Sequence, residues 1–145
     1  MKFPKVIPFA EALGFELLKF EAGEAEIAIT LRPEQLNTWQ VAHGGVTMTL
    51  LDVVMAHAAR APMPDQPKDD RGVVTIEMKT SFLRPGMKRL IGRGKLLHRT
   101  SSMAFCEGSV VDEAGELIAH STGTFKYLRG LPAGGKLIRR PGASD

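Results

Sequence analysis

Residues 37–52 read NTWQVAHGGVTMTLLD, and this stretch decides the fold that we expect. From Gly44 to about Ala61 the chain is apolar on nearly every side, with one carboxylate, Asp52, in the middle of the run. A helix that is apolar all round is normally enclosed by the rest of its domain. The pattern therefore predicts one long central helix, around which the other elements pack.

The start of this helix has the features of a site for negative charge. The first backbone N–H groups of a helix have no partner within it and can bind an oxygen that gains charge. Gly44 and Gly45 lack a Cβ, so a ligand can approach this backbone closely. Asp52 stands among leucines and valines, where an ionised group is costly. The combination predicts carbonyl chemistry in which a carboxylate acts as acid, base or nucleophile.

Purely structural interpretations of the same residues stay open at this point. Asp52 can be half of a buried ion pair or a hydrogen-bonded structural acid, since perturbed carboxylates also occur outside active sites. His43 can simply hydrogen-bond the backbone and orient the turn before the helix.

Helix geometry separates the two chemical groups. Asp52 follows Gly45 by seven residues, which places it about 10 Å further along the helix axis at 1.5 Å per residue. One chain therefore cannot easily bring both groups to the same atom. Two copies can do so if their central helices pack antiparallel. We expect a homodimer to be the catalytic unit.

The other segments predict an antiparallel sheet around the central helix. A short helix over residues 5–13 is stopped by Gly14, and residues 61–71 form a proline-rich loop. Gly115 suits the positive φ of a hairpin turn at residues 112–116. Alternating or apolar runs predict strands over 15–21, 24–31, 73–83, 87–97, 102–111 and 117–127.

These elements predict an α+β fold in one domain over residues 1–128. In the strand over 73–83, Val74, Ile76, Met78 and Phe82 are expected on one face. Residues 129–145 form a basic tail, rich in Gly and Pro, which we expect to be irregular.

Composition indicates the class of protein and the environment in which we expect it. The chain has 145 residues, 43% of them hydrophobic and 24% charged, as in ordinary globular proteins. Its one cysteine, Cys106, excludes an intrachain disulfide and suits a reducing environment. No apolar run is long enough to span a bilayer. We expect a soluble cytoplasmic protein without a membrane partner.

Positive charge is concentrated between Met78 and Cys106, although the net charge is only +3. This stretch has no acid and seven basic residues, which are Lys79, Arg84, Lys88, Arg89, Arg93, Lys95 and Arg99. They are either solvated strand ends or a surface for a polyanion. Only Phe82 and Phe105 interleave them, and no recognition motif is present, so a nucleic acid is not expected. A small phosphorylated carrier fits better.

Two other kinds of catalytic site find no support. The four histidines and one cysteine lack the spacing of metal ligands, so no metal site is expected. No G-x-S-x-G elbow is present for a serine hydrolase.

At these motifs the chain resembles the hotdog-fold acyl-CoA thioesterases, in the phenylacetate-degradation-type clade of the 4-hydroxybenzoyl-CoA thioesterase superfamily. That clade has an Asn six positions before an HGG motif, here Asn37 before His43-Gly44-Gly45, and an Asp nine positions after the His, here Asp52. A Phe-Leu-Arg-Pro-Gly signature appears at residues 82–86. The order of elements agrees from residue 13 to residue 127.

The resemblance implies hydrolysis of an acyl-CoA, with coenzyme A as part of the substrate and no separate cofactor. It implies that Gly44 polarises the thioester carbonyl beside Gly45, and that Asp52 of the partner subunit activates water or attacks directly. Asn37 would help to bind the reacting groups, and His43 would shape the loop. It also implies a homotetramer built from the dimer.

The resemblance implies further contacts with the substrate. Thr75 matches a position near the nucleophile, and Trp39 would overlook the pocket, where it selects the acyl group or packs the loop down. Basic residues at strand ends would meet the coenzyme A phosphates, with Arg84, Arg99 and Lys126 as candidates.

Two other functions on the same fold are weighed against hydrolysis. A hydratase or dehydratase pairs a His with an acid, but His57 is turned away from Asp52 on the helix, and His43 approaches Asp52 only across a dimer. A non-catalytic acyl-CoA binder needs the pocket but not Asp52. The acyl group, and the choice between coenzyme A and an acyl carrier protein, stay open.

Overall fold

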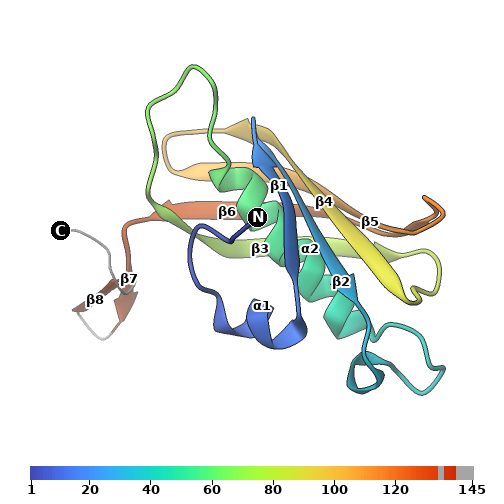
Figure 1. The fold of residues 1–145 in the computed structure, drawn as a ribbon. Coiled ribbons are helices and arrows are strands. Elements are labelled where there is room, and N and C mark those ends of the chain that lie inside the picture. Colours follow the sequence, from blue (N-terminus) through green and yellow to red (C-terminus); the bar gives the residue numbers. More distant parts are fainter. Residues whose placement is uncertain (134–135, 140–145) are drawn as a thin grey trace.

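A computed structural model describes residues 1–133 and 136–139 (Figure 1). The elements are α1 (Pro8–Leu13), β1 (Glu16–Glu21), β2 (Glu24–Thr30), a 3-10 turn η1 (Pro33–Gln35), α2 (Gly44–Arg60), β3 (Gly72–Phe82), β4 (Arg89–Arg99), β5 (Met103–Asp112), β6 (Leu117–Leu128), β7 (Gly130–Ala133) and β8 (Lys136–Arg139). The predicted central helix is therefore confirmed as α2.

Six strands form one antiparallel sheet in the order β1-β2-β4-β5-β6-β3, which curves around α2 (Figure 1). This arrangement confirms the α+β fold with one long helix in an antiparallel sheet. Because β1 and β3 are the outer strands, each has one edge without a neighbouring strand in this sheet. The β3 edge matters most here, since it lies beside the candidate site.

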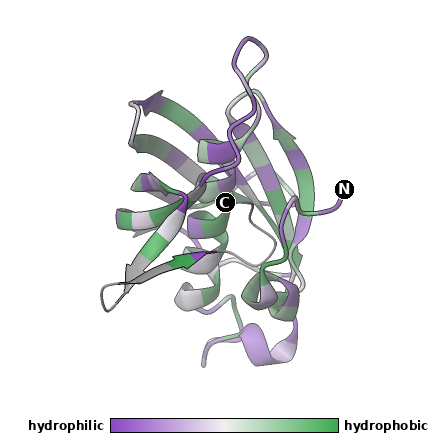
Figure 2. Ribbon diagram, turned by 90° about the vertical axis from the view of Figure 1, so that its left-hand side faces the viewer, coloured by the Kyte–Doolittle hydropathy of each residue, from purple (hydrophilic) through white to green (hydrophobic). Residues whose placement is uncertain are grey.

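The core lies between α2 and the concave face of the sheet. Leu50, Leu51, Val54 and Met55 of α2 are fully buried there against strand residues such as Phe125. Polar and apolar residues alternate along the strands, as Figure 2 shows, so only one face of each strand contributes to the core.

Glycine allows α2 to lie close to β4. A Cβ on Gly94 would stand 2.4 Å from the Val54 carbonyl oxygen, which is backbone and cannot turn aside. This contact fixes the depth at which the helix sits in the sheet.

The short first helix begins later than the sequence pattern predicted. It starts at Pro8, not Lys5, because proline is favoured in the first turn, where its missing N–H costs nothing. It ends as predicted at Gly14, which adopts a left-handed φ of 79°.

A bulge in β3 corrects the predicted strand faces. The register shifts between Thr75 and Glu77, so Ile76 is the extra residue. Met78 pairs with Gly123 and Phe82 with Ala119 on the helix side, whereas Val74 pairs with Lys126 on the outer side. The prediction that Val74, Ile76, Met78 and Phe82 share one face is therefore wrong. The bulge instead places Thr75, opposite Phe125, on the helix side.

The C-terminal segment is more regular than expected. Strands β7 and β8 form an antiparallel hairpin that projects beside the start of β3 (Figure 1). The rest of the predicted irregular tail, residues 134–135 and 140–145, lies outside the described residues. The hairpin turn at residues 112–116 is confirmed, with Gly115 at a φ of 83°.

His57 of α2 is a buried polar residue in this core. Its Nδ1–H donates to the Val53 carbonyl at 2.7 Å, while the rings of Phe3 and Phe20 pack edge-on against it. Its Nε2 has no hydrogen-bond partner in the described part of the chain. Burial lowers the pKa of His57 to about 4.

The titration of His57 predicts acid sensitivity of the fold. Between pH 6.5 and 4 the unfolded chain binds a proton at His57 that the folded chain does not, so stability falls as the pH falls. From the values of 6.5 and about 4, the free energy of unfolding should drop by about 2 kcal/mol between pH 7.5 and pH 5. In His57→Leu this component of the drop should disappear, as measured by urea unfolding at both pH values. An equal drop in variant and wild type would contradict this assignment.

Candidate active site

The start of α2 has one backbone donor without a partner. His43 is the N-cap, and its Nδ1 accepts the Gly45 N–H at 2.9 Å. The His43 carbonyl accepts the N–H groups of Val46 and Thr47. Within the described residues the Gly44 N–H makes no hydrogen bond. Gly44 is therefore the free donor, whereas the Gly45 N–H is engaged and only its lack of a Cβ can serve a ligand.

Asn37 holds the loop that leads into this helix. Its side-chain oxygen accepts the N–H groups of Trp39 at 2.8 Å and Val41 at 3.4 Å. Its backbone N–H donates to the Val41 carbonyl at 2.8 Å. The side-chain NH₂ makes no hydrogen bond in the described part of the chain, so it is the part of Asn37 that can meet a ligand.

Trp39 lies at the tip of this loop and is 82% exposed. The interpretation that it packs the loop down is therefore wrong for a single chain. Its ring is available to a substrate or to a second copy.

A cavity of about 410 Å³ opens beside the helix start. Asn37, Gly44 and Arg84 all contribute to its lining, so the structure brings these three predicted residues together. The Phe82 ring lies over the start of the helix, with its nearest atom 3.5 Å from the Cβ position of Gly44. A hydrogen bond from Ala42 N–H to the Gly86 carbonyl, 2.8 Å long, ties the loop to the Phe-Leu-Arg-Pro-Gly turn.

Asp52 belongs to a separate half-site. Its Oδ1 accepts a hydrogen bond of 2.6 Å from the Thr75 hydroxyl, which the β3 bulge turns toward α2. Asp52 is only partly buried, and no basic side chain of the described residues forms an ion pair with it. The alternative of a buried ion pair is therefore wrong for the single chain. Asp52 lies eight residues, or about 12 Å, beyond Gly44 along α2.

Gln35 is a structural part of this site that sequence reasoning missed. It is only 4% exposed, and its side chain accepts from Arg32 N–H and donates to the Leu13 carbonyl. Its own carbonyl accepts the His43 N–H at 3.0 Å. Gln35 thus connects the end of α1 to the residue that caps α2. A polar residue two positions before Asn37 carries no signal by itself.

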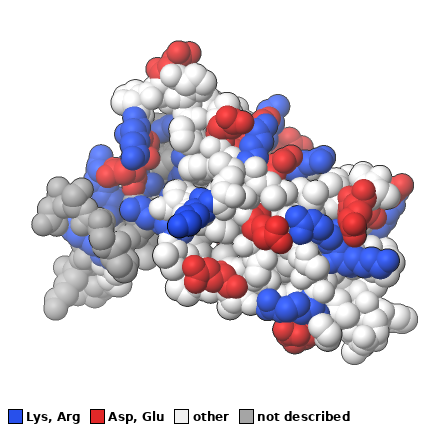
Figure 3. All heavy atoms as spheres, in the orientation of Figure 1, with Lys and Arg blue, Asp and Glu red and all other residues white. Residues whose placement is uncertain are grey.

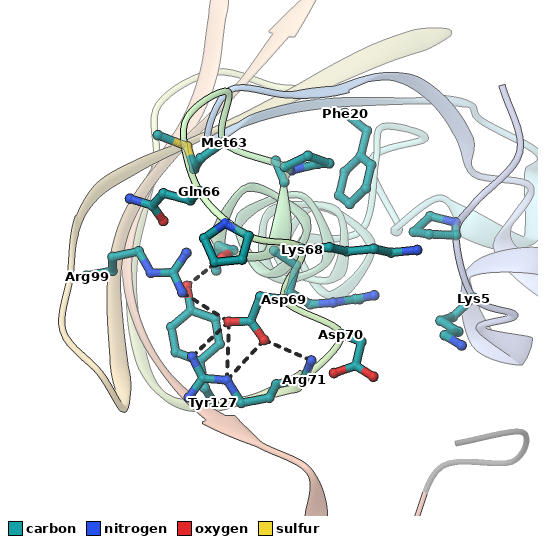
Figure 4. Close-up of a pocket in the computed structure, with 16 residues that line it drawn as sticks. Lys5, Phe20, Met63, Gln66, Lys68, Asp69, Asp70, Arg71, Arg99 and Tyr127 are labelled. Carbon is teal, nitrogen blue, oxygen red and sulfur yellow. Dashed lines mark hydrogen bonds and ion pairs between the residues drawn. The ribbon is translucent and has the colours of Figure 1, made fainter. Parts of the chain in front are cut away.

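The two candidate arginines lie at opposite ends of α2. Arg84 donates to the Leu117 carbonyl at 3.0 Å beside the Gly44 cavity. Arg99 donates to Asp69 at 3.0 Å and lies over the Tyr127 ring at the other end of α2 (Figure 4). Hydrogen bonds from Arg71 and Arg99 hold the pKa of Asp69 well below its usual range.

The basic stretch between residues 78 and 106 does not form a single positive surface. Four of its seven cations pair with acids of other segments, as Arg84–Glu116, Arg89–Glu16, Arg93–Glu26 and Arg99–Asp69. Blue and red groups alternate on the face that Figure 3 shows. The structure therefore favours paired, solvated strand residues over a surface for a polyanion.

The described residues contain neither a cluster of metal ligands nor a helix suited to span a membrane. No group of three or more His, Cys, Asp or Glu side chains is placed to hold a metal ion. No described helix combines the length and apolar character needed to cross a membrane.

Comparison with known proteins places this geometry in a family. The model of the thioesterase superfamily matches residues 40–119, which include the helix start, Asp52 and Thr75. The chain belongs to the thioesterase superfamily. Relatives that are named acyl-CoA thioesterases support a thioester hydrolase, and similar solved structures support the hotdog fold, as the resemblance at Asn37, His43 and Asp52 implied.

Individual relatives refine the assignment to the phenylacetate-degradation type. A mutant of the phenylacetic acid degradation protein PaaI from Thermus thermophilus is 30% identical, with a TM-score of 0.72, covering 84% of this chain and all of that one. A conserved protein from Pseudomonas aeruginosa gives a TM-score of 0.78 at 26% identity, covering 85% and 95% of the two chains. The medium/long-chain acyl-CoA thioesterase YigI of Escherichia coli is 27% identical over 131 residues, 82% of this chain and 84% of that one.

Proposed function

We propose that the protein is an acyl-CoA thioesterase whose active site is shared between two subunits. The observation that carries the proposal is the Gly44 N–H, which is without a partner in the described residues and lies beside a cavity at the start of α2. Such a donor can stabilise the oxyanion of a thioester under attack. The name of the similar E. coli thioesterase supports acyl-CoA as the substrate.

The reaction follows from the roles of Gly44 and Asp52. The thioester oxygen accepts the Gly44 N–H of one subunit, which makes the carbonyl carbon more electrophilic. The Asp52 carboxylate of the partner takes a proton from water, and the water oxygen attacks that carbon. The C–S bond then breaks, and coenzyme A leaves as a thiolate that takes up a proton. Direct attack by Asp52 is the second route, through an anhydride that water hydrolyses.

The position of β3 at the edge of the described sheet supports this sharing. Asp52 contacts Thr75 near the start of β3, whereas Gly44 lies against Phe82 at its end. Two copies that pair antiparallel along β3 would bring the Thr75 end of one strand to the Phe82 end of the other. The exposed side chains of Ile76, Phe82 and Leu83 would then be covered. Assembly of such dimers into a tetramer rests on the family resemblance.

The remaining predicted residues support this chemistry. The Asn37 amide NH₂ is available to hold the attacking water or the substrate. His43 fixes Gly45 and so leaves the Gly44 N–H as the donor. Arg84 lines the cavity at the helix start and would contact a polar part of the substrate, while the exposed Trp39 of the preceding loop would contact the acyl group.

We also propose that no separate cofactor takes part, because coenzyme A enters as part of the substrate. A cytoplasmic location suits the single buried cysteine and this substrate. Neither a nucleic acid nor a membrane is needed as a partner.

Thr75 is expected to position Asp52 for attack. Thr75→Val keeps the shape of the side chain but removes the hydroxyl that donates to Asp52. We expect kcat to fall about tenfold, because misplacing a reacting group is costly, while KM changes little. Thr75→Ser retains the hydroxyl and should keep most of the activity. A Thr75→Val enzyme with wild-type kcat would contradict the role.

A thiol-release assay over a panel of acyl-CoAs tests the proposed function. We expect turnover of at least one member by the wild type and its loss in Asp52→Asn. Bound ligand with no turnover in either protein would identify a non-catalytic binder. Addition or removal of water at the acyl chain, without thiol release, would identify a hydratase or dehydratase.

A further inference from the structure

The β7–β8 hairpin borders a groove at the start of β3. The groove has a volume of about 270 Å³, and it is lined by residues 72–74 of β3, the end of β6 and both strands of the hairpin. Leu128, Leu131 and Ile138 give it apolar walls, and Leu131 and Ile138 are 43% and 54% exposed. The catalytic steps proposed above do not use this groove.

The hairpin extends past the outer edge of the sheet. Strands β7 and β8 pair with each other and are separate from the six-stranded sheet. In Figure 1 the hairpin lies below the start of β3, on the side away from β6. This is the side on which β3 has no neighbouring strand in the described sheet. A further strand that pairs along β3 would therefore reach the groove between β3 and the hairpin.

The other end of the same edge presents apolar side chains that suit this groove. Phe82 and Leu83, at the end of β3, are 54% and 51% exposed. Exposed apolar groups beside an unpaired strand edge favour association with another chain. The eleven residues of β3 span about 35 Å, so one chain cannot bring its own Leu83 to its own groove. A second copy can.

An antiparallel pair of copies makes this contact twice. In a two-fold interface each contact occurs in both directions. The register that suits the shared site places Thr75 opposite the partner's Phe82. Val74 then lies opposite the partner's Leu83, and Val74 lines the groove. The partner's Leu83 thus reaches the groove at each end of the paired strands.

Charge at the two ends of β3 is also complementary. The groove lining contains two arginines, Arg129 and Arg139, and no acid, although Arg129 also pairs with Asp70 of its own chain. The turn over residues 112–116, beside the end of β3, contains three acids. Antiparallel pairing brings the arginines of one copy toward the acidic turn of the other, which favours a second copy as the occupant of the groove.

We propose that the β7–β8 hairpin is a dimerisation arm that holds the end of β3 of a second copy. Leu83 of the partner subunit packs into the groove against Leu131 and Ile138. The proposal rests on the dimer of the proposed function and adds an element to it. Because Phe82 also lies over Gly44, the arm of one subunit stands beside the Gly44 half-site of the other. It thereby helps to fix the two half-sites relative to each other.

Cross-linking between engineered cysteines tests this contact directly. The native Cys106 is buried, and burial raises the pKa of its thiol to about 12, so it should not react with maleimides at neutral pH. A Leu83→Cys/Leu131→Cys variant should form a covalent dimer in high yield with a short bismaleimide. Leu18→Cys/Leu131→Cys is the matched control, because Leu18 is an exposed leucine of β1, at the other edge of the sheet. It should run as a monomer on a denaturing gel.

Charged substitutions in the groove test its contribution to dimer stability. Leu131→Asp/Ile138→Asp places two carboxylates against the apolar side chains of the partner. It should raise the dissociation constant of the dimer at least tenfold, as measured by sedimentation equilibrium. Phe9→Asp, at an exposed position of α1 outside the groove, is the control and should leave the constant unchanged. Circular dichroism should match the wild type in both variants, because these side chains lie outside the core.

The outcomes separate this proposal from the proposed function. A monomeric wild type, absence of the cross-link between positions 83 and 131, or wild-type self-association of the aspartate variant would overturn the arm. An aspartate variant that changes only KM for long acyl chains would assign the groove to the substrate and also overturn it. A cross-linked dimer that hydrolyses no thioester would contradict the proposed function and leave the arm intact.

Discussion

Replacing Gly44 with proline is expected to lower kcat for acyl-CoA hydrolysis by about 10²–10³-fold, the usual cost of losing one oxyanion donor. Proline has no N–H, so the variant lacks the one donor at the helix start that makes no hydrogen bond within the described residues. Thiol release under saturating substrate measures the effect.

The same variant should stay folded. Gly44 is the first helical residue, a position at which proline is favoured. His43 before it has φ −61° and ψ 138°, an extended conformation that a following proline accepts. A Cβ at Gly44 meets only the Phe82 ring, at ordinary contact distance. Gly44→Ala retains the N–H and is the matched control, with kcat near that of the wild type. Equal kcat in both variants would contradict the role of the Gly44 N–H.

Replacing Asp52 with asparagine should lower kcat by about 10²–10⁴-fold, the range for loss of a general base. The amide oxygen can still accept the hydrogen bond from Thr75, so the helix and β3 should keep their contact. The variant removes only the basicity and nucleophilicity of the side chain. Steady-state thiol release, with circular dichroism to confirm the fold, measures the effect.

Two results would contradict this role for Asp52. One is wild-type turnover by Asp52→Asn. The other is equal loss in Glu77→Gln, a control at an exposed carboxylate on the outer side of the same β3 bulge.

Local patterns were sufficient to predict most of the fold. The apolar run from residue 44 predicted an enclosed helix. Gly14 ends α1 and Gly115 lies in the turn between β5 and β6, as expected, because left-handed backbone favours glycine. The bulge at Ile76 was not predictable, since alternation continues through it in the sequence. It depends on pairing with β6, which is a tertiary property.

The candidate site was predictable where its residues are close in sequence. Asn37, His43 and Gly44 act within one loop and one helix turn, so their spacing contained the information. The contact of Thr75 with Asp52 joins residues 23 positions apart and needed the structure. The ion pairs that neutralise Arg89 and Arg93 also cross strands, so the run of positive charge alone was misleading.

Mixing two inactive variants tests the shared site most directly. If Asp52 acts on the thioester held by its partner's Gly44, heterodimers of Asp52→Asn and Gly44→Pro contain one intact site. Random exchange in a 1:1 mixture makes half of the dimers heterodimers, so activity should recover to about one quarter of the wild type. A Gly44→Pro/Asp52→Asn double variant mixed with Asp52→Asn is the control and should stay inactive. If the single variants remain inactive after subunit exchange is verified by mass, Asp52 does not act across the dimer.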